Sequence, residues 1–433
     1  MSMFDSNSIH YWLEYIQGIH FRSIDLTLDR VKAVAGNLNF SDSFITIAVA
    51  GTNGKGSSVA YLESIYRYAG YKTAVYTSPH LVEYNERIRI NNVPVEDQAL
   101  IDAFRNVESA RQTTPLTYFE FGTLAAMCVF EQSKPDVCIL EVGMGGRLDA
   151  VNIFKHDISL ITEISLDHQA WLGSTVAEIA IEKAGIMHAG WPTVGSGLRP
   201  PAYLESHAKE IGCNRYQLGE HYGYEIINGR WNWIPLCDWK TPVFRLDGLR
   251  IPDGGVHQLQ NAAGAIAVAQ KLQPELPVRA KEIETGLRKR TLPARCQVID
   301  HVPTIILDVS HNIDGLRALN SFLQQFSSEK RLIAVFSMLA DKDCADAIRE
   351  VYSSIKHWVV TSVDSERSQT TDSLCSVLES IGTAPIIKSE NPESAVSTAI
   401  EMANADDCVV VFGSFYLVGD IMKFLNLHPY PSN

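Results

Sequence analysis

A short apolar run, a glycine-rich turn and a helical segment follow one another between residues 44 and 69. The run Phe44–Ala50 reads FITIAVA, which is typical of a buried strand, and apolar residues recur at helical spacing over Ser57–Ala69. Between them stands GTNGKGS. Glycines let backbone N–H groups close around an anion, the start of the helix adds positive potential, and Lys55 adds a full positive charge. The segment predicts a phosphate-binding loop.

This loop departs from the general phosphate-binding pattern at one position. In that pattern a hydroxyl residue directly follows the lysine, whereas Gly56 stands between Lys55 and Ser57. Such a loop can still cradle phosphate while another residue holds a metal ion. The alternative is a turn that only joins a strand to a helix, and the lysine and serine in the same turn weigh against it.

Apolar runs that suit buried strands alternate with helical segments along the chain, which predicts an α/β fold with mostly parallel sheets. Between Cys213 and Gly255 the pattern changes to short alternating runs rich in Tyr, Trp, Gly and Pro, which predicts a small antiparallel appendage. The strands expected before this appendage are Lys72–Thr77, Asp136–Val142 and Ile158–Ile164, and the helices expected around it are Phe119–Phe130, Thr175–Ile186 and Asn261–Leu272.

A charged helical segment between two prolines, Pro274–Pro293, indicates a passage to a second domain. We expect the boundary near Leu292–Gln297, with a P-loop domain at 1–294 and a Rossmann-like α/β domain at 295–433. The strands expected in the second domain are Thr304–Leu307, Leu332–Phe336, His357–Thr361, Pro385–Ile387 and Cys408–Phe412.

Composition narrows the class of protein. A chain of 433 residues with 46% apolar and 20% charged residues suits a two-domain globular protein, and no apolar run reaches the roughly 20 residues of a membrane helix. The N-terminus shows no signal-peptide pattern, so a cytoplasmic protein is expected. Eight cysteines without a CxxC pair indicate reduced thiols. The net charge of −13 disfavours nucleic acid and favours small-molecule partners.

Three polar side chains follow neighbouring strands of the predicted sheet. Ser78 follows Lys72–Thr77, Glu141 closes Asp136–Val142, and His168 comes after Ile158–Ile164. Because the carboxyl ends of parallel strands meet on the ligand side of a sheet, these groups are candidates to hold hydrated magnesium. Each also has an ordinary structural interpretation, as a capping serine, a paired glutamate and a loop histidine.

An ordered series of segments through most of the chain resembles the folylpolyglutamate synthase family, which is related to the Mur ligases. The series is GTNGKGS (51–57), TSPHL (77–81), ERI (86–88), TYFEFGT (117–123), LEVGMGGRLDAVN (140–152), DH (167–168), EKAGI (182–186), QNAA (260–263), LPAR (292–295), LDVSHN (307–312), MLADKD (338–343) and GSFYLVG (413–419). The glycine after the loop lysine is a feature of this family. The resemblance implies a Mur-ligase-like P-loop domain and a C-terminal domain that completes the ATP and glutamate site.

The resemblance also implies a role for each matching residue. ATP would be held by Thr52, Asn53, Gly54, Lys55, Gly56, Ser57, Asn261, Arg295 and Asp308, and Mg²⁺, as two ions, by Ser78, Glu141 and His168. His311 would lie close to the reacting phosphate. Lys183 would be carbamylated and so supply an anionic oxygen near the metal. Its local sequence instead favours an ion pair with Glu178 or Glu182.

For the acceptor, the resemblance points to three segments. They are Ser23, Ile24 and Asp25; Thr117, Tyr118, Phe119 and Glu120; and Leu148, Asp149 and Ala150. Phe119 could offer its ring to a pterin or benzoyl group, whereas Phe121 is expected in the core. Where relatives carry LDATN, this chain has Val151, which removes one hydroxyl.

The expected activity is ATP-dependent joining of L-glutamate to dihydropteroate and of further glutamates to tetrahydrofolate, by a monomer that binds no nucleic acid or membrane. Rivals are a synthase without dihydropteroate activity, a Mur-type ligase acting on a UDP-sugar peptide, and a GTP-binding switch protein. The last lacks the Asn/Thr-Lys-x-Asp guanine motif.

Overall fold

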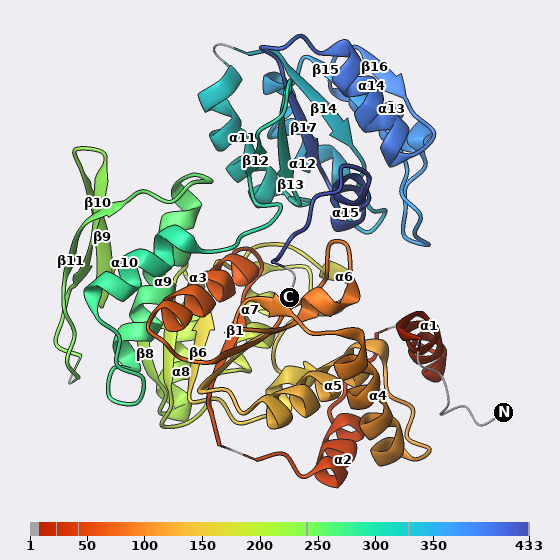
Figure 1. Cartoon of the computed structure of the whole chain (residues 1–433). Coiled ribbons are helices and arrows are strands. Elements are labelled where there is room, and N and C mark those ends of the chain that lie inside the picture. The colour runs from red at the N-terminus through yellow and green to blue at the C-terminus, as the bar shows by residue number, and fades with distance from the viewer. Residues whose placement is uncertain (1–7, 23, 42, 240, 328–329, 432–433) are drawn as a thin grey trace.

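The computed structural model describes residues 8–431 except 23, 42, 240 and 328–329 (Figure 1). It contains an eight-stranded sheet, a three-stranded sheet and a six-stranded sheet. The first two are built from the N-terminal part of the chain, and the third from the C-terminal part, which lies above them in Figure 1. The predicted α/β class is confirmed.

The eight-stranded sheet has the order β4-β3-β2-β5-β1-β6-β7-β8. In this order, all neighbours from β2 to β8 pair in parallel. At one edge, β3 pairs antiparallel with both β2 and β4. The strands are β1 (Ile45–Ala50), β2 (Thr73–Tyr76), β3 (Ile88–Ile90), β4 (Val93–Pro94), β5 (Val137–Glu141), β6 (Ile158–Ile161), β7 (Pro192–Gly195) and β8 (Asn214–Gln217).

Helices bury both faces of this sheet, which explains its nearly continuous apolar strands. In β1, Ala48 and Ala50 face one core, and Ile47 and Val49 face the other. The first core is covered by α1 (Ile9–Ile19), α2 (Asp29–Leu38), α4 (Asp97–Arg111), α5 (Tyr118–Ser133), α7 (Val176–Ala184) and α8 (Ala202–Ile211), with the short α6 (Gln169–Leu172) beside it. The second core is covered by α3 (Lys55–Tyr68), α9 (Val256–Lys271) and α10 (Ala280–Lys289).

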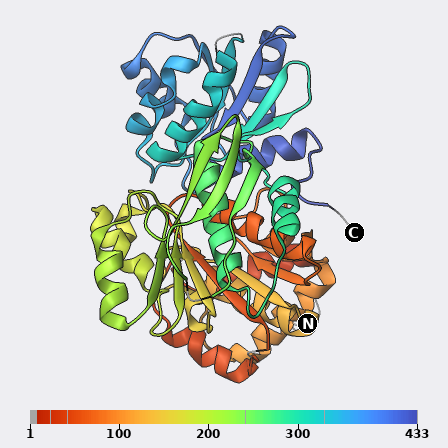
Figure 2. The same cartoon turned by 90° about the vertical axis from the view of Figure 1, so that its left-hand side faces the viewer.

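The antiparallel appendage is smaller than the sequence indicated. Asn214–Gln217 is β8, a parallel edge strand of the main sheet, so the start of the predicted appendage at Cys213 is wrong. The three-stranded sheet consists of β9 (Tyr222–Ile227), β10 (Arg230–Pro235) and β11 (Leu246–Arg250). Its Trp233 is fully buried and donates a hydrogen bond to the carbonyl of Ala263 in α9 at 3.1 Å. Figure 2 views the molecule from the side of this layer, which covers α9.

The C-terminal sheet has the order β12-β13-β17-β14-β15-β16, with β12 antiparallel at the edge. Its strands are β12 (Gln297–Ile299), β13 (Thr304–Asp308), β14 (Leu332–Phe336), β15 (His357–Val360), β16 (Ile386–Lys388) and β17 (Cys408–Phe412). One face is covered by α11 (Ile313–Ser327), α12 (Cys344–Arg349) and α13 (Thr371–Ile381), and the other by α14 (Pro392–Met402) and α15 (Phe415–Phe424).

The passage between the two α/β units runs from the end of α10 to the start of β12. It contains two non-glycine residues in the left-handed region, Ala294 with φ 51° and Cys296 with φ 48°. Within this passage the chain leaves the N-terminal sheets and enters the C-terminal sheet. We therefore propose that the two domains comprise residues 1–294 and 295–433.

The two units also meet through side chains. Leu81 and Val82, from the loop after β2, pack against the core beneath α15, and a Cβ at Gly419 of α15 would lie 2.0 Å from the carbonyl oxygen of Leu81. After α15 the chain runs back to the first unit, where the ring of Tyr430 lies 4.3 Å from the Arg89 guanidinium (Figure 1). Among the helices built from described residues, none is long and apolar enough to cross a membrane.

Candidate active site

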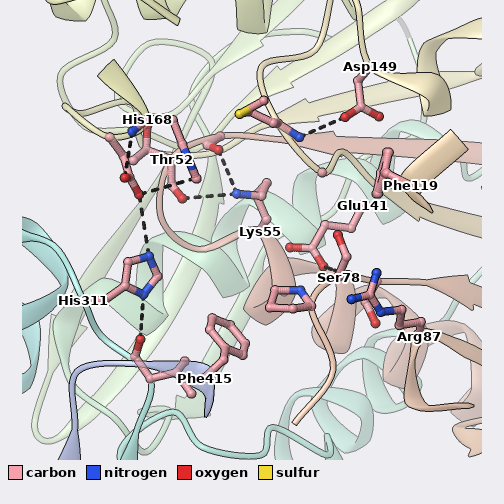
Figure 3. A pocket seen from close by; sticks show the side chains of 18 of the residues that line it. Thr52, Lys55, Ser78, Arg87, Phe119, Glu141, Asp149, His168, His311 and Phe415 are labelled. Atoms are coloured by element: carbon pink, nitrogen blue, oxygen red, sulfur yellow. Dashed lines mark hydrogen bonds and ion pairs between the residues drawn. The ribbon is translucent and has the colours of Figure 1, made fainter. Parts of the chain in front are cut away.

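A cavity of about 530 Å³ lies between the two α/β units, at the carboxyl ends of the strands of the main sheet. It is lined by the glycine-rich loop, by the loops after β2, β5 and β6, by the start of α5, and by segments of the second unit around His311, Lys342 and Phe415. Most of the residues predicted for the site meet here (Figure 3).

The glycine-rich loop needs glycine at two positions. Gly51 has φ 152°, and a Cβ there would lie 1.8 Å from Thr162 Oγ1; Gly54 has φ 89°, and a Cβ there would lie 2.3 Å from Asn261 Oδ1. Both contacts are too close for a Cβ, so the loop can pack against Thr162 and Asn261 in this conformation only with glycine at these positions. Lys55 opens α3 and folds over the loop, with Nζ 3.0 Å from the Gly51 carbonyl.

Three predicted nucleotide residues support the cavity without lining it. Ser57 is buried, and its Oγ accepts a hydrogen bond from Gln258 Nε2 at 3.3 Å. Asn261 backs Gly54, and the Asp308 carboxylate accepts hydrogen bonds from the backbone N–H groups of Cys296 and Ser310. Thr52, Asn53, Gly56 and Arg295 line the cavity.

Glu141 and Ser78 lie side by side at the ends of β5 and β2. Ser78 N donates to Glu141 Oε2 at 3.3 Å, and Glu141 is 6% exposed. Burial raises the pKa of Glu141, while the charges of Lys55 and Arg295 lower it. Glu141 thus places a buried carboxylate at the cavity, where it could bind a divalent cation, either alone or together with a phosphate group.

On the other side of Lys55, His168 and Asp167 follow β6 (Figure 3). His168 is in the left-handed region with φ 52°, and burial lowers its pKa to about 4, so the imidazole is neutral at pH 7 and free to act as a ligand. Burial by itself raises the pKa of Asp167, but the nearby His311 ring and the charges of His168 and Lys342 outweigh it and hold that pKa well below its usual range.

Asp167 joins the two α/β units. Its carboxylate accepts a hydrogen bond from Lys342 Nζ at 2.6 Å and one from Asn312 Nδ2 at 3.2 Å, and it lies 3.7 Å from His311 Nε2. All three partners belong to the second unit, and His311 is oriented further by the Val309 carbonyl, 2.8 Å from Nδ1. These contacts hold His311 at the edge of the glycine-rich loop.

Lys183 is buried behind the glycine-rich loop, 4% exposed, with Nζ donating to the Gly51 carbonyl at 2.7 Å. Burial, together with the charge of Lys55 on the same carbonyl, lowers its pKa to about 7. The ion pair favoured by the local sequence is wrong. Glu178 instead caps the start of α7 through Ser174 and Thr175, and Glu182 pairs with Arg147 at 2.8 Å.

The residues predicted for the metal fit a divalent cation, although no three His, Cys, Asp or Glu side chains among the described residues form a metal cluster. The predicted set contains only two residues of those types, Glu141 and His168, together with the Ser78 hydroxyl. Figure 3 shows Glu141 and Ser78 on one side of Lys55 and His168 on the other. Oxygen and nitrogen groups that can bind a divalent cation thus lie on both sides of Lys55.

The three segments predicted for the acceptor line the cavity, and we call this part of its lining the acceptor wall. Ile24 and Asp25, then Thr117, Phe119 and Glu120, and finally Leu148, Asp149 and Ala150 line it. Ser23 lies outside the described residues, and Tyr118 stands behind the wall with its ring 5.5 Å from the Arg87 guanidinium. Phe121 is fully buried in the core, as expected.

Phe119 and Asp149 give this wall its shape. A Cβ at Gly143 would lie 2.5 Å from the Phe119 ring, so the ring packs directly on backbone. Asp149 is 4% exposed and accepts hydrogen bonds from Met144 N and Val151 N. Burial raises its pKa to about 6 against these hydrogen bonds.

Several residues that line the cavity were not among those predicted from the sequence. Asp167, Lys342, Arg87, Phe415 and Tyr416 all occur in the segments that carried the resemblance, so they could have been selected from it. Tyr430 occurs in none of those segments, and no signal in the sequence pointed to it.

Two protein-family models match most of the chain. The model described as "Mur ligase middle domain" matches residues 49–269, and "Mur ligase, glutamate ligase domain" matches residues 294–415. The chain belongs to the Mur ligase family. The resemblance seen in the sequence is confirmed by the relatives that follow.

A dihydrofolate synthase/folylpolyglutamate synthase from Escherichia coli strain K12 is 36% identical over 416 residues, covering 96% of this chain and 95% of the relative. A structure titled E. coli FolC in complex with DHPP and ADP has a TM-score of 0.91 at 34% identity, covering 98% of this chain and 99% of that one. A bifunctional folylpolyglutamate synthase/dihydrofolate synthase with Mn, AMPPNP and L-glutamate bound has a TM-score of 0.89 at 36% identity, covering 98% and 99%. This Mur ligase family member thus shares its whole fold with bifunctional folate synthases.

Proposed function

We propose that the chain is an ATP-dependent ligase that joins L-glutamate to dihydropteroate, forming dihydrofolate, and adds further glutamates to tetrahydrofolate. The observation that carries this is near-full-length similarity to dihydrofolate synthase/folylpolyglutamate synthases, 36% identical over 96% of the chain. The cavity supports it, because a phosphate-binding loop and an aromatic acceptor wall line the same space.

The reaction must overcome the low reactivity of a carboxylate. Hydroxide is a poor leaving group, so ATP first phosphorylates the acceptor carboxylate to an acyl phosphate, releasing ADP. The α-amine of glutamate then attacks the acyl carbon and phosphate leaves. Both steps move negative charge between oxygen atoms, which cationic and N–H groups fixed in advance stabilise best.

The chain's own residues supply those groups. Lys55 and the N–H groups of the glycine-rich loop would hold the ATP phosphates, and His311, held by Asp167, would face the transferring phosphoryl group. Arg295 lies at the passage between the units, with Asn261 and Asp308 behind the nucleotide site. The contacts of Lys342 and Asn312 with Asp167 keep the second unit over the loop, which would exclude water that hydrolyses an acyl phosphate.

We propose that Mg²⁺ is held by Ser78, Glu141 and His168, with a carbamate on Lys183 as a further anionic partner. When bound, the ions would neutralise phosphate charge and stabilise the charge that develops on transfer. The Glu141 carboxylate faces the cavity beside Ser78, and His168 is neutral, as a ligand requires.

Glu141→Gln should keep the shape of the side chain but remove its charge, so turnover should fall about 10²-fold and the half-saturating Mg²⁺ concentration should rise. Mn²⁺ binding followed by electron paramagnetic resonance in the presence of ADP gives a readout independent of turnover. Glu108→Gln, at a buried glutamate paired with Arg111 outside the cavity, is the matched control. Wild-type Mg²⁺ dependence in Glu141→Gln would show that Glu141 is structural.

The partners we propose are small molecules, namely ATP, L-glutamate, dihydropteroate and tetrahydrofolate. The proposed state is a cytoplasmic monomer that binds neither nucleic acid nor membrane.

A panel of acceptors tests the proposed function. ADP release should require L-glutamate together with dihydropteroate or tetrahydrofolate. ADP release with L-glutamate and tetrahydrofolate, but not with L-glutamate and dihydropteroate, would identify a synthase without dihydropteroate activity. ADP release with a UDP-muramyl acceptor would identify a Mur-type ligase. GTP preference without any acceptor would contradict all ligase assignments.

A further inference from the structure

Arg30 ties together two of the segments that form the acceptor wall. Its Nη1 lies 3.2 Å from Asp25 Oδ2, and its Nη2 lies 3.2 Å from Glu120 Oε1 and 3.3 Å from the Asp25 carbonyl. Asp25 and Glu120 both line the cavity, whereas Arg30 does not. The guanidinium therefore joins two lining segments without lining the cavity itself.

The two bridged segments differ in how firmly they are otherwise held. Glu120 is fixed by its own helix, because Thr117 and Glu120 cap the start of α5 reciprocally, with Thr117 N donating to Glu120 Oε2 at 2.7 Å. Residues 24–28 form neither helix nor strand. Among the described residues, the other side chain within ion-pair distance of the Asp25 carboxylate is His20, whose Nε2 lies 3.7 Å away. Arg30 thus attaches a segment without regular structure to a rigid helix end.

The pairing is also shielded from water, so it is stronger than an exposed ion pair. The exposed fractions of the side chains are 19% for Arg30, 16% for Asp25 and 5% for Glu120, and Arg30 Nε is buried without a hydrogen-bond partner. The planar guanidinium reaches both carboxylates at once with separate N–H groups, which a lysine ammonium on its single atom cannot reproduce.

Arg30 has little part in the core of its own helix. The side chains of Val31 and Val34 are fully buried in the first core, where α2 packs against α4 and α5. Leu28 packs on the same core and its carbonyl accepts a hydrogen bond from Lys32 N at 2.9 Å, so it stays with α2. Loss of the Arg30 side chain should therefore release residues 24–27 while α2 stays in place.

We propose that Arg30 is a positioning residue for the acceptor: it holds Ile24–Thr27 at a fixed separation from the start of α5 and so sets the affinity for the pteroyl part of the substrate. This rests on the proposed function, because it takes the cavity wall to be the acceptor site. Dihydropteroate and tetrahydrofolate share the ring system that this wall would contact, so both should depend on Arg30 to a similar extent.

Steady-state kinetics test the proposal. In Arg30→Ala, KM for dihydropteroate and for tetrahydrofolate should each rise at least about tenfold, while KM for ATP and kcat stay within about threefold of the wild type. Arg30→Lys should restore little of the loss, because it contacts only one carboxylate. Arg331→Ala is the matched control: Arg331 pairs with the largely buried Asp407 at 2.6 Å in the second unit, away from the cavity, and its loss should leave every KM unchanged.

Amide hydrogen exchange of the substrate-free protein tests the bridge without assuming any substrate. Exchange over residues 24–27 should accelerate in Arg30→Ala and not in Arg331→Ala. Acceptor KM values unchanged in a folded Arg30→Ala enzyme, or equal rises in the KM values for ATP and acceptor, would overturn the proposal. Wild-type protein that releases no ADP with either acceptor would instead overturn the proposed function, and the exchange result would still decide whether Arg30 holds residues 24–27.

Discussion

Lys55→Ala is expected to lose turnover by about 10³-fold while remaining folded, because it removes the positive charge that the glycine-rich loop presents to the phosphates. Lys55 Nζ has only the carbonyls of Gly51 and Thr52 as hydrogen-bond partners among the described residues, at 3.0 and 3.3 Å. Its loss breaks no buried ion pair. It removes a repulsion from a protonated Lys183 and an attraction to the Glu141 carboxylate, two effects of opposite sign, so the unfolding temperature should change little.

Turnover measured by ADP release, with the thermal unfolding midpoint as a check on folding, decides this prediction. Lys271→Ala is the control, because Lys271 is also half-buried and donates to Tyr216 Oη at 2.7 Å, outside the cavity. A folded Lys55→Ala enzyme with near-wild-type turnover would reject the phosphate-binding role of the loop lysine.

Lys183→Ala and Lys183→Arg are both expected to be nearly inactive. The amines of Lys183 and Lys55 share the Gly51 carbonyl, at 2.7 and 3.0 Å, so two cations compete for one acceptor. With its pKa lowered to about 7, a large fraction of Lys183 is uncharged near neutral pH and can attack carbon dioxide. The carbamate that forms is an anion beside Lys55, whereas arginine stays charged and forms no stable analogue.

Chemical rescue separates carbamylation from a purely structural lysine. Small carboxylic acids should partly restore turnover in Lys183→Ala by placing an oxygen anion where the carbamate would be, and they should not help Lys55→Ala. Glu182→Gln, which breaks only the half-exposed pair with Arg147, should cost about 0.3–0.5 kcal/mol of stability at most and leave turnover intact. An active Lys183→Arg enzyme would exclude the carbamate.

Most of the buried strands were predictable because they carry an apolar run that no helix period explains; β7, which reads PTVG and is also largely buried, was not predicted. β1, β5 and β17 are buried along nearly their whole length, and their bounds fall within the predicted runs. Polar edge strands gave no such signal. β8 reads NRYQ and is half-exposed, and β12 presents Val298 to solvent with 49% of its surface exposed, so neither shows an apolar run.

One missed element did carry a signal. β3 and β4 form a hairpin whose turn contains Asn91 and Asn92, both in the left-handed region with φ 53° and 69°. Two asparagines between short alternating runs are typical of a tight hairpin turn. The two asparagines thus indicated a hairpin that was not among the strands predicted from the sequence.

The phosphate-binding part of the site followed from local sequence, since strand, loop and helix are contiguous. The contacts of Asp167 did not, because Lys342 and Asn312 lie 175 and 145 residues further along the chain. The ion pair that the local sequence favoured for Lys183 was wrong. Glu178 and Glu182 lie close to Lys183 in the sequence, but neither is three or four residues away, so neither shares its helix face. The helix start and Arg147 take the two carboxylates, and the lysine turns inward to Gly51.

Isotope transfer from the acceptor shows whether the reaction passes through an acyl phosphate. Dihydropteroate labelled with ¹⁸O in its carboxylate is incubated with the enzyme, ATP and L-glutamate, and both products are examined by mass spectrometry. Activation as an acyl phosphate predicts dihydrofolate that has gained glutamate and lost one ¹⁸O, with that ¹⁸O in the released phosphate and none in ADP. Dihydrofolate formed together with unlabelled phosphate, or ATP hydrolysis without any glutamate-containing product, would contradict the account.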